Sequence, residues 1–332
     1  MSVEVLAAGP LTTVQDAGRR GLRHLGIGRS GALDHWALRV GNLLVGNRED
    51  APALEITLHG PTLRFHAPAR IALCGADTGA RLDGARVPGW RPCDVPAGST
   101  LRIGACRDGA RALLALAGGI DVPAALGSAS TDLRGGFGGL DGRALRRGDR
   151  LAVGRCDAVA NGSAAVAPWW IDPQADADPR AAIRLLPGAD AADGLCAARW
   201  RVAAASNRQG LRLEGAALAP DAQHARISQP VLPGTVQLPP DGRPIVLLAD
   251  AQTHGGYPVV GHVATAELSR LARLRPGDAL RFAWCSVDEA RALACVQRQR
   301  LARIAMAIEA RLRADRASRR VQAAPSVSRD RP

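Results

Sequence analysis

The stretch LRRGDRL, residues 145–151, recurs as LRPGDAL, residues 274–280, with five of the seven positions identical. A Gly-Gly-aromatic triplet precedes each copy, GGF at 135–137 and GGY at 255–257. An internal repeat usually marks one supersecondary unit that is used more than once. Two motifs repeated in the same order therefore predict two related β units.

The sequence around both copies consists of short apolar runs broken by Gly, Pro and Asp, such as ALEITLHGPTLRF at 53–65. Such spacing is typical of many short strands in barrels or sandwiches. Helical signals are few: one helix is expected over 34–45, another over 264–275, and a long one begins at the capping box of Ser286 and Glu289. The fold class predicted is mainly β with a few helices, two β units and a long C-terminal helix.

Domain boundaries follow from composition. The segment 157–180 is rich in Ala, Asp and Pro, which is typical of a linker. The helical stripe ends in a basic tail that resembles a frayed terminus. We therefore expect an N-terminal β unit at 1–160, a linker at 161–180, a C-terminal β unit at 181–285, a helix at 286–318 and a disordered basic tail at 319–332.

The chain has 332 residues and a formal net charge of +12, so nucleic acid and membrane surfaces must be considered as partners. Ten arginines and only three acidic residues lie from 298 onward, so most of the excess charge belongs to one terminal segment. Aromatic residues are 3% of the chain, too few to interleave with the arginines for base stacking. There is no long apolar run and no basic leader. We expect a cytoplasmic protein with neither nucleic acid nor membrane as partner.

The sequence contains no lysine, which excludes a P-loop lysine, a Schiff-base lysine and a biotinylated lysine in this chain. Its seven cysteines are scattered and form no C-x-x-C pair. We therefore expect them to be reduced thiols that pack as small apolar side chains. His254 and His262 lie eight residues apart without helical spacing, and no metal site is expected.

Four polar clusters interrupt the apolar pattern, at 13–37, 130–143, 206–215 and 234–258. Each joins glycines to amides, hydroxyls or carboxylates, a combination that suits a ligand-binding loop. The alternative for each cluster is a turn in which Asp, Asn or Ser bonds its own backbone. The candidate residues in the four clusters are Asp16, His24, Asp34, Thr131, Asp132, Asn207, Arg208, Gln237, Asp250, Gln252, Thr253, Gly255, Gly256 and Tyr257.

These clusters, together with ALEITLHGP and LAGGIDVP, follow the order seen in one family over about residues 3–285. The chain resembles the C subunits of 5-oxoprolinases, a family that includes an antagonist of a sporulation-kinase inhibitor and proteins similar to allophanate hydrolase subunit 2. It is also similar to the second carboxyltransferase half of urea carboxylase. The resemblance implies two cyclophilin-like β-barrel units. The chain departs from the family at 206–211, where it reads SNRQGL instead of SDRMGY, and at His254, where Thr is common.

The resemblance implies ATP-dependent opening of 5-oxoproline to glutamate, with Mg-bound ATP used by a complex with 5-oxoprolinase subunits A and B. The second of these partners would resemble the kinase inhibitor. We expect Asp250, Gln252 and Tyr257 to be catalytic, since a lactam needs proton transfer and fixed donors for its developing anion. The other candidates are expected to bind substrate, Arg208 as a clamp for a carboxylate or phosphate.

Two other functions remain open at this point. A carboxyltransferase would move CO2 from carboxybiotin to urea or a similar amide, with the biotin carried on another chain. A non-catalytic regulator would bind a partner that resembles the kinase inhibitor.

Overall fold

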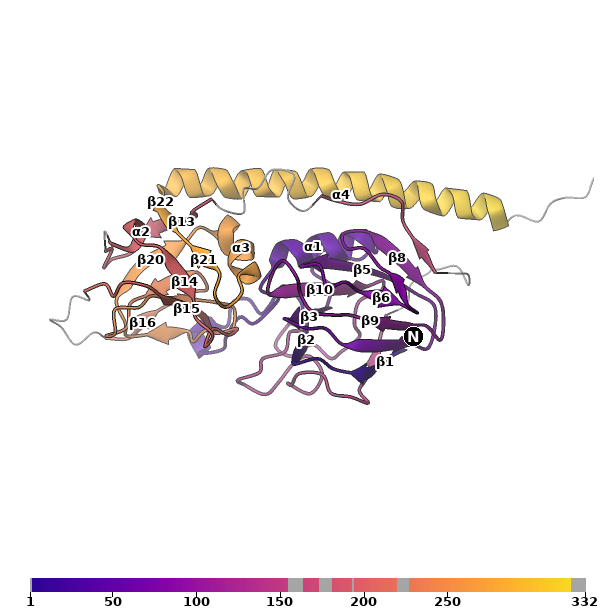
Figure 1. The fold of residues 1–332 in the computed structure, drawn as a ribbon, viewed down its shortest axis with the longest axis horizontal. Coiled ribbons are helices and arrows are strands. Elements are labelled where there is room, and N and C mark those ends of the chain that lie inside the picture. The colour runs from indigo at the N-terminus through magenta and orange to yellow at the C-terminus, as the bar shows by residue number, and fades with distance from the viewer. Residues whose placement is uncertain (1, 155–163, 173–180, 193, 220–226, 324–332) are drawn as a thin grey trace, which may run out of the picture.

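Two β units lie side by side, and one long helix runs along both of them (Figure 1). The computed structural model describes residues 2–154, 164–172, 181–192, 194–219 and 227–323. The prediction of a mainly β chain with few helices and a long C-terminal helix is confirmed.

The N-terminal unit consists of two antiparallel sheets of six strands each. The first has the order β11 (Arg150–Ala152), β1 (Ser2–Ala7), β4 (Thr62–Phe65), β9 (Thr100–Arg102), β6 (Arg81–Leu82) and β7 (Ala85–Arg86). The second has the order β12 (Ala165–Val166), β8 (Pro92–Val95), β5 (Ala69–Gly75), β10 (Arg111–Leu116), β3 (Ala53–Thr57) and β2 (Leu11–Gln15).

Strand β5 shows why the second sheet is apolar on both faces. Successive side chains of a strand point to opposite faces. Ile71 and Leu73 face the core between the two sheets, whereas Ala72 and Cys74 face a second core beneath the helices. The continuous apolar run of β5 is therefore explained by burial on both sides.

The C-terminal unit is one eight-stranded sheet that nearly closes on itself. Its edge strands are consecutive in the sequence and are separated only by Arg281. The order is β21 (Ala279–Leu280), β14 (Trp200–Val202), β15 (Gly210–Glu214), β18 (Ile245–Leu247), β17 (Thr235–Gln237), β20 (Val259–Val263), β13 (Ile183–Pro187) and β22 (Phe282–Trp284). A separate pair, β16 (Gln229–Pro230) and β19 (His254–Gly255), lies at its end.

The repeated LR-x-GD motif adopts the same turn in both units. Each aspartate carboxylate accepts a hydrogen bond from the amide three residues earlier, over 2.7 Å at Asp149 and 2.8 Å at Asp278. Each aspartate carbonyl accepts a second hydrogen bond from the neighbouring strand, at Val5 and at Val202. The glycines before them have φ values of +90° and +89°, which other residues rarely adopt.

The helices are η1 (Arg23–Leu25), α1 (His35–Leu44), α2 (Gly194–Ala197), η2 (Thr265–Glu267), α3 (Leu268–Arg273) and α4 (Val287–Ala323). The capping box at the start of α4 is present: Ser286 N donates to Glu289 Oε2 and Glu289 N donates to Ser286 Oγ. The helix passes over α1 and packs Leu301, Ile308 and Leu312 onto the core there (Figure 1).

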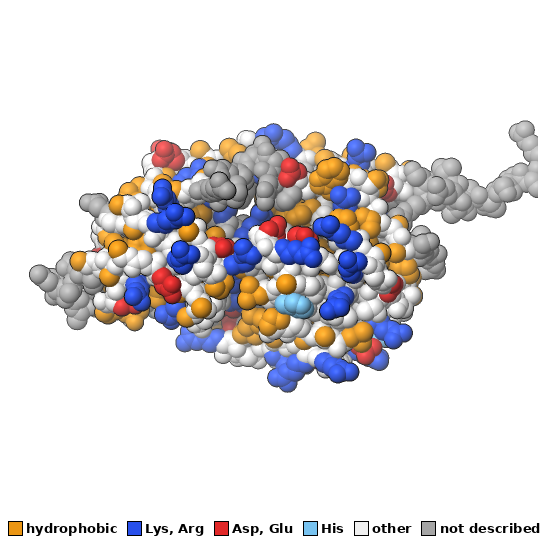
Figure 2. All heavy atoms as spheres, in the orientation of Figure 1, with side chains coloured by type: hydrophobic (Ala, Val, Ile, Leu, Met, Phe, Trp, Pro, Cys, Tyr) orange, Lys and Arg blue, Asp and Glu red, His pale blue; other side chains and the backbone are white. Residues whose placement is uncertain are grey.

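The ends of the predicted segments differ from those observed. Helix α4 continues to Ala323, so residues 319–323, expected in the tail, are helical, whereas 324–332 lie outside the described residues. Within the expected linker, β12 pairs with β8, and 173–180 lie outside the described residues. In the part of the chain described, six cysteines are unpaired, no helix is long and apolar enough to span a bilayer, and no metal-binding cluster occurs. Figure 2 shows arginines spread over one face with acidic and apolar side chains among them.

Candidate functional site

A pocket of about 480 Å³ lies at the seam between the two β units; we call it the seam pocket. The C-terminal unit contributes the segment after β18, and the N-terminal unit contributes two glycine-rich loops. The lining residues are Gly26, Ile27, Gly28, Asp132, Arg134, Gly135, Phe137, Asp250, Ala251, Gln252, Thr253 and His254. Three of the four polar clusters in the sequence therefore meet at one place.

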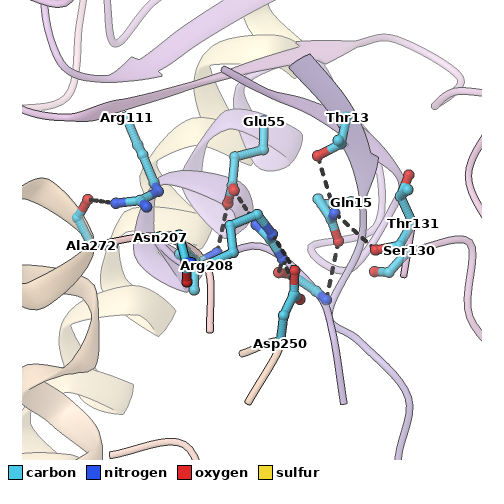
Figure 3. Close-up of polar contacts among 12 residues, drawn as sticks. Thr13, Gln15, Glu55, Arg111, Ser130, Thr131, Asn207, Arg208, Asp250 and Ala272 are labelled. Carbon is cyan, nitrogen blue, oxygen red and sulfur yellow. Dashed lines mark hydrogen bonds and ion pairs between the residues drawn. The ribbon is translucent and has the colours of Figure 1, made fainter. Parts of the chain in front are cut away.

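Beside the pocket, Arg208 joins the two units through a buried ionic cluster (Figure 3). Its Nε and Nη2 donate to Asp250 over 2.8 and 2.9 Å, and its Nη1 donates to Glu55 of β3. Its Nη2 also donates to the carbonyl of Gly31 over 2.7 Å. A planar guanidinium suits such a multiple arrangement, because its donors point in fixed directions.

Burial and the paired charges act against each other in this cluster. Desolvation raises the pKa of Asp250, and Arg208 counteracts that rise only in part. For Arg208, desolvation lowers the pKa, but Glu55 and Asp250 outweigh it, so its pKa is raised and it is fully charged. Nearby, Arg111 is buried, its pKa is lowered by desolvation, and its Nη1 donates to the carbonyl of Ala272 over 2.8 Å. Arg208 therefore holds the units together and is not free to clamp a ligand.

Gln252 lines the pocket and is bonded to Gln237, which, like Gly255, is not among the lining residues. Gln252 Nε2 donates to Gln237 Oε1 over 3.3 Å, and Gln237 is 1% exposed. The Nε2 of Gln237 is buried and has no acceptor among the described residues. A Cβ added at Gly255 would lie 2.5 Å from that nitrogen, so any larger residue here would force the Gln237 amide to move. Unsatisfied buried amides are rare and often mark functional sites.

Asp132 presents a free carboxylate oxygen from the N-terminal side. Its Oδ1 accepts hydrogen bonds from the amides of Arg134 and Gly135 over 3.1 and 2.8 Å. Its Oδ2 has no hydrogen bond to the described residues and lies near Gly28, 3.7 Å from where a Cβ would be. Both oxygens of Asp250, in contrast, are bonded to Arg208. Asp132 is therefore the carboxylate better placed to act on a ligand.

Asp16 and Thr131 hold the Asp132 loop in place. Asp16 accepts from Ser128 Oγ, Ser130 Oγ and the amide of Ala129 over 2.5 to 2.7 Å. Thr131 Oγ1 donates to the carbonyl of Val14, in β2, over 3.0 Å. Neither residue lines the seam pocket. Asp16 and Thr131 therefore bond backbone and hydroxyl groups of neighbouring segments, as in the alternative in which polar residues of these clusters stabilise turns.

Other candidates lie outside the pocket. Asp34 caps α1 at Ala37 N and pairs with Arg273 over 2.9 Å, so it is structural. Asn207 is exposed and its Oδ1 accepts from the amide of Gln209, as in a turn. Three more candidate residues do not line the pocket and are exposed to solvent: His24, Gly256 and Tyr257. Of the three residues expected to be catalytic, Asp250 and Gln252 line the pocket and Tyr257 does not.

Glu55 and Arg111 were not among the residues predicted from the sequence. Glu55 lies within the apolar strand ALEIT and is 1% exposed. A charged residue at an inward strand position is the signal that could have been used, because such residues are almost never fully buried unless paired. Arg111 opens the run RALLAL in the same way and is 5% exposed.

Comparison with known families identifies the class of this fold as a carboxyltransferase domain. The chain belongs to that family: the model for the carboxyltransferase domain, subdomains A and B, matches residues 25–284. The resemblance found in the sequence is thereby confirmed.

Among individual proteins, the chain is 42% identical to the C subunit of 5-oxoprolinase from Escherichia coli, over 87% of this chain and 93% of that protein. It is 36% identical to the same protein of Haemophilus influenzae, over 87% and 93%. It is 32% identical to urea amidolyase of Saccharomyces cerevisiae, over 88% of this chain but only 17% of that protein.

Two solved structures are similar in fold. The crystal structure of TTHA0988 has a TM-score of 0.74 and 37% identity, and covers 85% of this chain. The crystal structure of the K. lactis urea amidolyase has a TM-score of 0.80 and 31% identity, and covers 91% of this chain. This chain spans about 55% of the first protein and 20% of the second.

Proposed function

We propose that this chain is the C subunit of an ATP-dependent 5-oxoprolinase, which opens 5-oxo-L-proline to L-glutamate together with partner subunits. The observation that carries the proposal is the 42% identity with the E. coli 5-oxoprolinase protein across 93% of its length. A match over almost the whole length of both chains implies the same unit, whereas the match to yeast urea amidolyase covers 17% of a larger enzyme. The expected partners are 5-oxoprolinase subunits A and B, in the cytoplasm.

The seam pocket supports this reaction through its polar groups. A lactam carbonyl is stabilised by resonance. Transfer of the γ-phosphoryl group of ATP to the carbonyl oxygen, with release of ADP, would make the carbonyl carbon more electrophilic towards water, and phosphate would leave as the ring opens. Gln252 keeps its carbonyl oxygen and one N–H free for the ring amide, because its only side-chain hydrogen bond to the described residues is to Gln237. Asp132 Oδ2 would take the proton of the attacking water. Asp250, bonded to Arg208, fixes the loop that presents Gln252.

The test uses the complex purified with its partner subunits, assayed for glutamate from 5-oxoproline and ATP. Parallel assays supply urea and carboxybiotin. We expect the first reaction alone, and losses of at least about 100-fold in kcat for Asp132→Asn and Gln252→Ala, as for other catalytic bases and fixed donors. Asn207→Ala, an exposed turn residue, is the control and should change kcat less than about threefold.

The alternatives give different results in the same assays. Transfer of CO2 to urea without glutamate formation would identify a carboxyltransferase. Full activity of both variants in an intact complex would mean that the seam pocket is not catalytic, and would favour a regulator that only binds its partners.

A further inference from the structure

A second and larger pocket, of about 710 Å³, lies beneath α4; we call it the α4 pocket. Its walls are the loop after β2, α1 and the turn that follows it, the start of α3 and the first half of α4. The helices involved are neighbours in Figure 1, where α4 runs over α1 and α3. The α4 pocket shares no lining residue with the seam pocket. A volume of this size is within the range of small-molecule sites.

Four arginines line the α4 pocket: Arg20, Arg29, Arg39 and Arg298. Arg39 lies 3.9 Å from Glu49, a distance that allows only a weak ion pair. The other three form no ion pair with any of the described residues. The first three come from the N-terminal unit and the last from α4, so these cations are brought together only when the helix is packed in place.

Three acidic residues line the same pocket, Asp16, Glu49 and Asp50, and they offset these arginines only in part. Asp16 accepts four hydrogen bonds from the backbone and hydroxyls of its own loops, including that from Gly18 N. Asp50 pairs with Arg48, outside the pocket, over 3.2 Å. Four arginines and three carboxylates therefore line the pocket, a formal excess of one positive charge, and Arg29 and Arg298 have no ion pair among the described residues.

Arg29 shows most clearly that an anion is missing. Its Nη2 donates to the carbonyl of Ala17 over 3.3 Å, whereas its Nε is buried and has no acceptor among the described residues. Burial lowers the pKa of Arg29, and the charges of Arg20, Arg23 and Arg39 lower it further. A buried donor without a partner and a desolvated cation among like charges are both costly, and a bound anion would relieve both.

The shape and chemistry of the α4 pocket select a phosphate-bearing ligand. Guanidinium groups bind phosphate oxygens with paired donors, and several arginines together match several phosphates. The apolar side chains of Trp36, Leu38 and Leu301 line the same space and would accommodate a base. His35 also lines it, with a pKa lowered to about 4 chiefly by burial, so it is neutral near pH 7.

We propose that the α4 pocket binds a nucleoside triphosphate, whose phosphates contact Arg20, Arg29 and Arg298 and whose base lies against the apolar wall. The identification of the ligand as ATP rests on the proposed function, because that reaction consumes ATP.

The test is isothermal titration calorimetry on the full chain with ATP, inorganic triphosphate and adenosine, each at low and high salt. ATP and triphosphate should bind, with affinity that falls as salt rises, and adenosine should not. Arg29→Met and Arg298→Met should each weaken ATP binding about tenfold or more, the loss expected for one hydrogen bond between charged groups. Arg298 is exposed on α4, so its variant should fold normally even if that of Arg29 does not.

Arg64→Met is the matched control, because Arg64 is exposed on β4 and lines neither pocket. Absence of ATP binding by the full chain, or equal ATP affinity in the Arg298 and Arg64 variants, would overturn the inference. Glutamate formation by the complex is scored separately. If the complex forms glutamate but the α4 pocket binds no ATP, the proposed function is kept and the ATP site is refuted. If the pocket binds ATP but the complex does not open 5-oxoproline, the ATP site is kept and the proposed function is refuted.

Discussion

Replacing Arg208 by Met should weaken the contact between the two β units more than other arginine substitutions in this region. Arg208 is 4% exposed and donates to Glu55 and Gly31 of one unit and to Asp250 of the other. Methionine fills similar volume but removes every one of these donors. Glu55 and Asp250 would remain buried, with side chains 1% and 6% exposed, and would lose their countercharge.

The expected loss in the free energy of unfolding is about 3–5 kcal/mol, the usual result of removing one partner of a buried ion pair. This is a large share of the roughly 5–15 kcal/mol that stabilises a typical protein. The loss should shrink as the pH falls. Burial already raises the pKa of Asp250 above its unfolded value, and removing Arg208 raises it further. The folded state then binds this proton first, so stability increases as the pH falls through the folded pKa towards about 4.

Urea denaturation followed by tryptophan fluorescence measures this effect at pH 7 and at pH 5. Arg212→Met is the control, since Arg212 is exposed and its side chain forms no ion pair with the described residues. It should change the free energy of unfolding by less than about 0.5 kcal/mol. If the Arg208 variant loses under about 1 kcal/mol, or loses more at pH 5 than at pH 7, the account of this cluster is incorrect.

Three further outcomes can be checked. Gly255→Ala should displace the Gln237 amide that lies 2.5 Å from the added Cβ, and so raise KM for 5-oxoproline in steady-state assays of the complex, while the melting temperature changes little. His35→Gln should remove a pH-dependent loss of stability. The pKa of His35 is lowered to about 4 in the folded state, so the unfolded state binds the proton first. Wild-type stability should therefore fall as the pH drops below about 6.5, by at most about 3 kcal/mol, as denaturation at several pH values will show. Ile308→Ala, on the buried face of α4 at a residue 2% exposed, should cost about 2–4 kcal/mol in urea denaturation. Met306→Ala, on the same helix at a residue 72% exposed, should cost almost nothing.

The fold could be predicted from the sequence because its signals are local. Turn residues at regular intervals mark the short strands, and Asp34 and Ser286 mark the helix starts that are observed. The repeated turn at 145–151 and 274–280 predicted two units. The end of α4 was misplaced because its last turns carry charged residues on most sides, so that no apolar stripe marks the boundary.

The site was only partly predictable, since a polar cluster in the sequence does not show which partner its side chains will find. Asp16 and Asp34 have the same functional groups as Asp132, yet both are used to hold backbone amides. Gln237 and Gln252 meet because the segment between β18 and β20 passes beside the end of β17, which bridges residues 15 apart in the chain. Glu55 is 153 residues from Arg208, so their contact depends on how the units pack.

The loop before α1 separates the two pockets and explains why each can be tested alone. Gly28 lines the seam pocket, and the next residue, Arg29, lines the α4 pocket. The backbone that follows is fixed to the C-terminal unit, because Ser30 N donates to the carbonyl of Ala249 over 3.1 Å. It is fixed again one residue later, where Arg208 binds the carbonyl of Gly31. Shortening the Arg29 side chain leaves both backbone contacts in place, so a loss of ATP binding in that variant would report on the guanidinium itself.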